Sequence, residues 1–83
     1  MSKAHVIVYS RPGCHLCDDA IAAIKAARCD EAFTFAEVNI ETSPELLSKY
    51  QFDIPVITIN DVEAFRHRVD TKKFKELLRS APN

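Results

Sequence analysis

The sequence predicts a single α/β domain, spanning residues 1–83, in which a four-stranded mixed β-sheet carries helices on both faces. Runs rich in β-branched and aromatic residues alternate with stretches of helical periodicity, in the order β-α-β-α-β-β-α. The opening β-α-β unit implies a right-handed crossover between parallel strands. Later, the dipeptide Asn60-Asp61 predicts a two-residue hairpin turn and therefore an antiparallel pair.

The first half of the chain is expected to form two strands around one helix. Residues 5–10 predict a buried strand, because β-branched and aromatic side chains cluster there between polar flanks. Apolar residues then recur at helical spacing over residues 17–28. Residues 33–40 form the second expected strand, with Phe33 and Phe35 on one face and further apolar residues on the other. Apolar character on both faces suits a strand that helices cover on both sides.

The second half begins with a short helix and continues into a hairpin. Ser43 suits the N-cap and Pro44 the first helical position, so a helix is expected from there to about Tyr50. Residues 56–59 form the third expected strand and residues 62–67 the fourth.

The last expected element is a C-terminal helix. Asp70 or Thr71 provides its cap, because a short polar side chain can accept hydrogen bonds from the first unpaired N–H groups. The apolar residues behind this cap recur at helical spacing and are expected to face inward: Phe74, Leu77 and Leu78.

A Cys-x-x-Cys motif lies where the first strand ends and the first helix begins. Pro12 and Gly13 break the strand and predict a turn. Cys14 then stands at the start of the helix, and Cys17 lies one turn further along. A dithiol at a helix start is placed for redox chemistry.

This placement has a direct effect on the reactivity of Cys14. Cysteine reacts as the thiolate, and a free thiol has a pKa of about 8.5. Unpaired N–H groups and the helix dipole favour negative charge at a helix N-terminus and lower the pKa there to about 3.5–7.5. We therefore assign Cys14 as the nucleophile and Cys17 as the resolving cysteine that attacks a mixed disulfide formed at Cys14.

Composition narrows the class of protein. The formal net charge is −1, and the basic residues of the last third lack interleaved aromatics, so no nucleic-acid partner is expected. No apolar run approaches the roughly 20 residues of a membrane span. Because the N-terminus leads straight into the first expected strand, no signal peptide is expected. Three cysteines cannot form a full disulfide framework, which favours a reducing, cytoplasmic setting. We expect a monomer.

The chain resembles proteins of the thioredoxin fold and, within it, the small glutaredoxin-like proteins, because three sequence landmarks occur in the order found there. They are the segment from Tyr9 to Cys17, the Ile54-Pro55 dipeptide before the third strand, and the hairpin turn. The resemblance covers essentially the whole chain. It implies that Pro55 follows a cis peptide bond and packs against the dithiol, and that the backbone at Ile54 pairs with the substrate as an added strand.

The resemblance also implies a glutathione site. Arg11, three residues before the first cysteine, Ile54 before the proline and Asp70 at a helix start match the residues that hold glutathione in glutaredoxins. The glycine pair of that family is absent, and residues 64–67 read Ala-Phe-Arg-His instead. Arg66 or Arg68 are alternative contacts for the glutathione carboxylates. The middle residues of the motif, His-Leu, also differ from the Pro-Tyr usual in glutaredoxins.

The leading hypothesis is therefore a dithiol thiol–disulfide oxidoreductase that reduces protein or small-molecule disulfides through Cys14 and Cys17. It needs no bound cofactor; glutathione, or a glutaredoxin- or thioredoxin-type reductase, would restore the dithiol. Two alternatives remain open: a metal or iron–sulfur binding protein, and a redox-inert interaction module. No metal site is expected within one chain, because zinc prefers four ligands and Cys29 is too far along the helix from Cys17 to complete a set. We interpret Cys29 as a packing residue.

Overall fold

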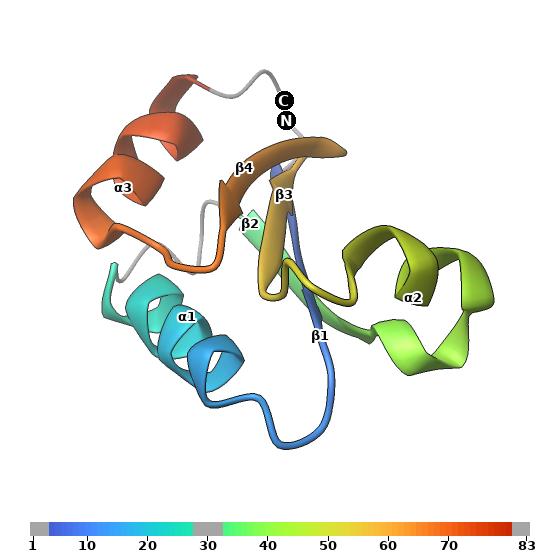
Figure 1. The fold of residues 1–83 in the computed structure, drawn as a ribbon. Helices are drawn as coiled ribbons and strands as arrows, with labels where there is room; N and C mark the ends of the chain where they lie inside the picture. The colour runs from blue at the N-terminus through green and yellow to red at the C-terminus, as the bar shows by residue number, and fades with distance from the viewer. Residues whose placement is uncertain (1–3, 28–32, 81–83) are drawn as a thin grey trace.

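A computed structural model describes residues 4–27 and 33–80 (Figure 1). The elements follow the predicted order, with one short 3-10 helix, η2, added after the second strand. Their bounds are β1 Ala4–Ser10, α1 His15–Ala26, β2 Phe33–Asn39, η2 Ile40–Thr42, α2 Pro44–Tyr50, β3 Val56–Ile59, β4 Val62–Arg66 and α3 Thr71–Ser80.

The four strands form one mixed sheet, as predicted, and their order in the sheet is β2-β1-β3-β4. β1 runs parallel to β2 and antiparallel to β3, and β3 pairs antiparallel with β4. In the parallel pair, Ala4 lies opposite Phe33 and Ser10 opposite Asn39. This register brings the C-terminal ends of β1 and β2 together, beside the turn that leads into α1 (Figure 1).

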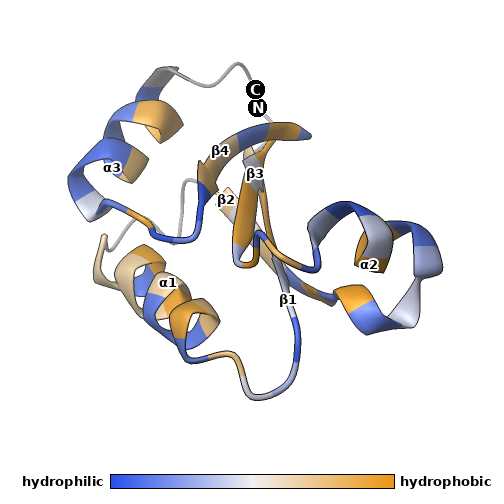
Figure 2. Cartoon of the chain, in the orientation of Figure 1, coloured by the Kyte–Doolittle hydropathy of each residue, from blue (hydrophilic) through white to orange (hydrophobic). Residues whose placement is uncertain are grey.

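Helices cover both faces of the sheet (Figure 1). On one face, α1 and α3 pack over the larger core cluster, where Ile24 and Phe74 are almost completely buried. On the other face, α2 and η2 contribute Tyr50 and Ile40 to a smaller cluster around Val56. Figure 2 shows α3 with its apolar residues on one side and its polar residues on the other. Burial of these apolar faces is the main stabilising contribution to such a fold.

Local signals predicted the second half of the chain well. Ser43 accepts a hydrogen bond from the N–H of Leu46, and α2 begins at Pro44 and ends at Tyr50 as expected. The Asp70 carboxylate accepts hydrogen bonds from the N–H groups of Lys72 and Lys73 at 2.9 and 3.2 Å. Of the two expected caps for α3, Asp70 is therefore the one that acts.

The hairpin turn has the backbone that its residues predict. Asn60 and Asp61 both have positive φ angles, of 52° and 68°. A two-residue hairpin turn needs such angles at both positions, because they match the right-handed twist of the strands on either side. β4 ends at Arg66 rather than at the predicted His67. His67 has left-handed backbone, with φ of 73°, and this conformation ends the strand.

Two expectations for the first half were wrong. α1 begins at His15 rather than at residue 17, because Cys14 already caps the helix. Phe35 is 42% exposed, although a strand buried on both faces was expected. β2 is an edge strand, and an open groove between α1 and β2 leaves the Phe35 ring accessible. Residue 28, the expected end of the first helix, lies outside the described residues.

Within residues 4–27 and 33–80, no helix has both the length and the apolar character needed to cross a membrane.

Candidate redox site

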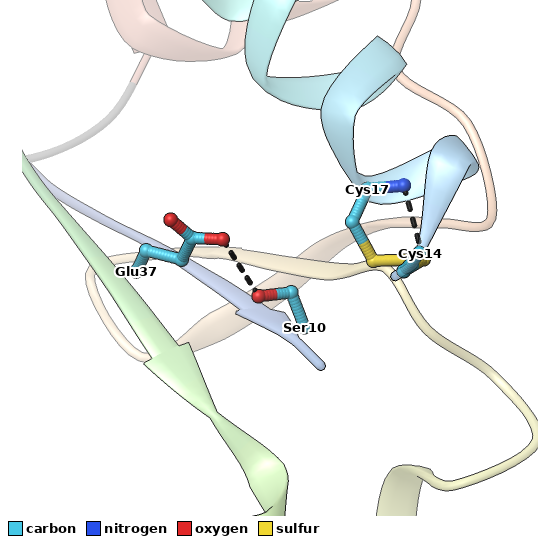
Figure 3. Close-up of a disulfide and its surroundings, with 4 residues drawn as sticks. All are labelled: Ser10, Cys14, Cys17 and Glu37. Carbon is cyan, nitrogen blue, oxygen red and sulfur yellow. Dashed lines mark hydrogen bonds between the residues drawn. A yellow bond between two sulfur atoms is a disulfide. The ribbon is translucent and has the colours of Figure 1, made fainter. Parts of the chain in front are cut away.

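The turn between β1 and α1 places Cys14 at the helix start. Gly13 has φ of 78°, a left-handed conformation that glycine adopts without the strain of a Cβ atom. Cys14 is the N-cap of α1 and has extended backbone. Its Sγ atom accepts a hydrogen bond of 3.1 Å from the N–H of Cys17 (Figure 3). The N–H of Cys17, one of the first amide groups of the helix without an intrahelical partner, is therefore directed to this sulfur.

Cys14 and Cys17 are joined by a disulfide bond in the structure. Their Cα atoms lie 5.2 Å apart, within the range that a disulfide spans. The two residues differ in accessibility: Cys14 is half-buried, whereas Cys17 is only 2% exposed. An incoming substrate can therefore reach the first sulfur more easily than the second.

A cavity of about 330 Å³ opens beside the disulfide. It takes residues from the ends of β1 and β2 and from the start of α1: Ser10, Arg11, Pro12, Gly13, Cys14, Cys17, Asp18, Glu37 and Asn39. Three of these side chains carry charge, so the space next to the sulfurs is polar. Such a cavity can admit the polar backbone or the charged end of a disulfide-containing substrate.

Sequence reasoning missed one polar pair in this cavity. The buried Ser10 hydroxyl donates a hydrogen bond of 2.8 Å to Glu37 Oε2 (Figure 3). The two residues are 27 positions apart, and only the parallel register of β1 and β2 brings them together. The one sequence feature that could have indicated this pair was Ser10 itself, a polar residue directly after the apolar run of the first strand.

Arg11 lies in the same cavity, at the position expected for a substrate contact. Its guanidinium donates a hydrogen bond to Glu41 Oε2 at 2.9 Å, and both side chains remain about two-fifths exposed. A surface ion pair of this kind contributes little to stability, so exchanging Glu41 for a ligand carboxylate would cost little.

The other expected substrate contacts lie on two loops. The Ile54–Pro55 peptide bond is cis. Pro55 is fully buried, and its carbonyl oxygen accepts a hydrogen bond of 2.8 Å from the N–H of His67. Ile54 packs against the smaller core cluster under α2. Asp70 caps α3, as described above, and no described contact links it to the dithiol.

Residues 64–67 stand where glutaredoxins have a glycine pair, and Arg66 of this segment takes part in an ion-pair network. Arg66 pairs with Asp53 at 2.9 Å and with Glu63 at 2.7 Å. The hydrogen bonds that the Arg66 guanidinium donates to the Glu63 carboxylate raise the pKa of Arg66 and lower the pKa of Glu63. Arg68, by contrast, lines a second cavity of about 260 Å³ together with Leu16, which follows Cys14 by two positions. Of the two arginines, Arg68 is therefore better placed to meet a ligand.

Across the described ranges, no group of three or more His, Cys, Asp or Glu side chains is arranged to hold a metal ion. Cys29, interpreted from the sequence as a packing residue, lies outside the described residues.

Comparison with known proteins places the chain in a family. Residues 5–79 match the glutaredoxin-like domain (DUF836). The chain is 34% identical over 71 residues to the glutaredoxin-like protein YDR286C homolog of Dictyostelium discoideum. That alignment covers 78% of this chain and 66% of the relative, so the chain spans just under two thirds of the relative's length.

Solved structures agree with this assignment. Protein XcR50 from X. campestris superimposes with a TM-score of 0.78 at 30% identity, covering 93% of this chain and 99% of that one. Protein Ne2328 from Nitrosomonas europaea gives a TM-score of 0.77 at 26% identity and covers 92% of both chains. The oxidized mitochondrial thioredoxin 3 of Saccharomyces cerevisiae shares the fold, with a TM-score of 0.70 at 10% identity over 98% of this chain and 81% of that one. The chain therefore belongs to the glutaredoxin-like domain family and has the thioredoxin fold.

Proposed function

We propose that this protein is a dithiol thiol–disulfide oxidoreductase that reduces disulfides of proteins or small molecules. The Cys14 thiolate attacks one sulfur of the substrate disulfide and forms a mixed disulfide, and the other substrate sulfur leaves as a thiolate. Cys17 then attacks the Cys14 sulfur, and the second substrate thiolate leaves. The substrate has gained two electrons, and the protein holds the Cys14–Cys17 disulfide.

One observation carries this proposal: a half-buried cysteine caps a helix and is bonded to a buried cysteine one turn away. The capping N–H groups stabilise negative charge on Cys14 Sγ, which makes it both a nucleophile and a good leaving group. The short Cα separation lets Cys17 reach the mixed disulfide without movement of the helix. An interaction module without redox chemistry would not need this asymmetric pair.

The reductant that restores the dithiol belongs to the same proposal. Glutathione would be bound by Arg11, by the backbone at Ile54 and by Asp70, with Arg68 as a further contact for a carboxylate. A glutaredoxin- or thioredoxin-type reductase is the alternative donor. A potential between about −200 and −270 mV, the range of glutaredoxins and thioredoxin, would suit a reductant in the cytoplasm. We propose that the protein works in the cytoplasm, because thiols stay reduced there. We also propose that it is a monomer.

A reductase assay tests the proposal. Reduction of a small disulfide and of a glutathionylated peptide is measured with glutathione, and then with a thioredoxin reductase system, as the electron donor. We expect turnover with at least one donor and none above background for Cys14→Ser, because that variant lacks the attacking sulfur. Wild-type protein that is no faster than Cys14→Ser with either donor would remove the proposed function.

A further inference from the structure

The cavity beside the disulfide has an unbalanced charge. Three charged side chains line it: Arg11, Asp18 and Glu37. Arg11 is neutralised by Glu41, whose carboxylate accepts its hydrogen bond at 2.9 Å. Among the residues that the structure describes, neither Asp18 nor Glu37 takes part in an ion pair. Two carboxylates without a cationic partner therefore lie in the cavity that contains both sulfurs.

Both of these carboxylates are accessible to a ligand. Glu37 is exposed, and the buried Ser10 hydroxyl fixes its position through the hydrogen bond to Oε2. An ionised carboxylate has about four acceptor sites, so this one bond leaves others for a ligand. Asp18 is an exposed residue of the first turn of α1. A group that enters the cavity therefore meets acceptors that are already in place.

The second cavity, which Leu16 and Arg68 line, has a different charge. Its one carboxylate, Asp19, shares the space with the guanidinium of Arg68. The excess of negative charge is therefore specific to the cavity that Cys14 and Cys17 line.

We propose that the substrate disulfide carries a basic group beside it, an ammonium or guanidinium, which binds Asp18 and Glu37; this rests on the proposed function. Such a group donates charge-assisted hydrogen bonds to carboxylates. An acidic substrate would meet like charge from both side chains and from the Cys14 thiolate. A cleft of one sign also raises the rate of encounter with ligands of the opposite sign. The cavity volume, about 330 Å³, lies within the range of ligand sites.

Three disulfide-linked peptides test the preference, and they differ only in the residues beside cysteine, which are lysine, serine or glutamate. Pre-reduced protein carrying Cys29→Ser reacts with each peptide in a single turnover, and released peptide thiol is measured after rapid quenching. Each rate is divided by the rate of the same peptide with dithiothreitol, which corrects for the reactivity of the disulfide itself. We expect a corrected lysine-to-glutamate ratio of at least about tenfold at about 20 mM salt, within the range of electrostatic steering. It should fall to about threefold or less at about 0.5 M salt, because salt screens exposed charges.

Matched variants assign the preference to the two carboxylates. The double variant Asp18→Asn, Glu37→Gln should bring the corrected ratio at low salt to within about twofold of one, since surface charges act only nearby. The control is Glu45→Gln, Asp61→Asn, which changes the net charge equally but alters exposed residues outside the cavity. It should keep the wild-type ratio.

A second arm distinguishes small substrates from protein segments. Cystamine, a disulfide with two ammonium groups, is compared with the uncharged bis(2-hydroxyethyl) disulfide under the same correction. A preference that depends on the carboxylates in both arms assigns the cavity to the basic group itself. The same preference for cystamine alone assigns it to small amine disulfides, and for the lysine peptide alone to basic protein segments.

The inference is overturned if neither arm shows a preference in wild type, or if the double variant keeps the preference. It is also overturned if the control variant loses the preference equally, because net charge alone would then explain it. If wild type reduces none of these disulfides faster than Cys14→Ser does, the proposed function itself fails.

Discussion

Replacing Cys17 with serine is expected to stop the reaction after its first step. Cys14, the proposed nucleophile, and its helix-start environment remain, so we expect a substrate disulfide still to be attacked. No neighbouring sulfur can then displace the bound half of the substrate. With a disulfide-bonded peptide and no other thiol present, the variant should accumulate as a mixed disulfide at Cys14, whereas wild type should finish as the internal disulfide. Intact-mass and peptide-mass measurements on the quenched reaction distinguish the two products.

Cys29→Ser provides the matched control for this trap, because it also removes one thiol but leaves both motif cysteines. It should complete the reaction as wild type does. Release of both halves of the peptide by Cys17→Ser, at the wild-type rate, would show that Cys17 is not the resolving residue.

Replacing Phe74 with alanine is expected to lower the free energy of unfolding by about 3–5 kcal/mol. The Phe74 ring is fully buried and contacts Phe33 edge-to-face, with ring centroids 5.5 Å apart. It links α3 to the sheet within the larger core cluster. Truncation removes this apolar surface from the core and leaves a cavity that the surrounding helices fill only in part. Urea unfolding followed by circular dichroism measures the change.

Phe52→Ala is the control for this substitution, because its ring is 85% exposed and the loss should stay within about 0.5 kcal/mol. If Phe74→Ala does not fold, Phe74→Leu should fold with a smaller loss, since leucine keeps part of the apolar volume. Equal stability of the Phe74 and Phe52 variants would show that Phe74 is not the contact that fixes α3 to the sheet.

Much of the fold could be predicted because its signals are local. Ser43 and Pro44 determine where α2 begins through one cap and one fixed φ angle. Asn60 and Asp61 tolerate the left-handed backbone that a tight hairpin needs. Cys14 was placed at the helix start from the adjacent Pro-Gly turn and from the helical spacing that follows Cys17, and the structure shows it there.

What could not be predicted depends on the position of an element within the sheet. Phe35 has the side chain of a core residue but is partly exposed, because β2 is at the edge and its outer side has no neighbouring strand. The contact between Ser10 and Glu37 arises from strand register, which neither residue reveals in its own segment. The pairing of Arg66 with Asp53, which joins β4 to the loop before β3, also could not be predicted from the sequence of either segment by itself.

The proposed function requires that the start of α1 stabilises Cys14 as a thiolate. The direct measurement is the rate of alkylation of Cys14 by iodoacetamide in the reduced protein as a function of pH, with the modified residue identified by peptide mass. We predict a midpoint below neutral pH, well under the value of about 8.5 for a free cysteine. A midpoint at or above that of free cysteine would contradict the account.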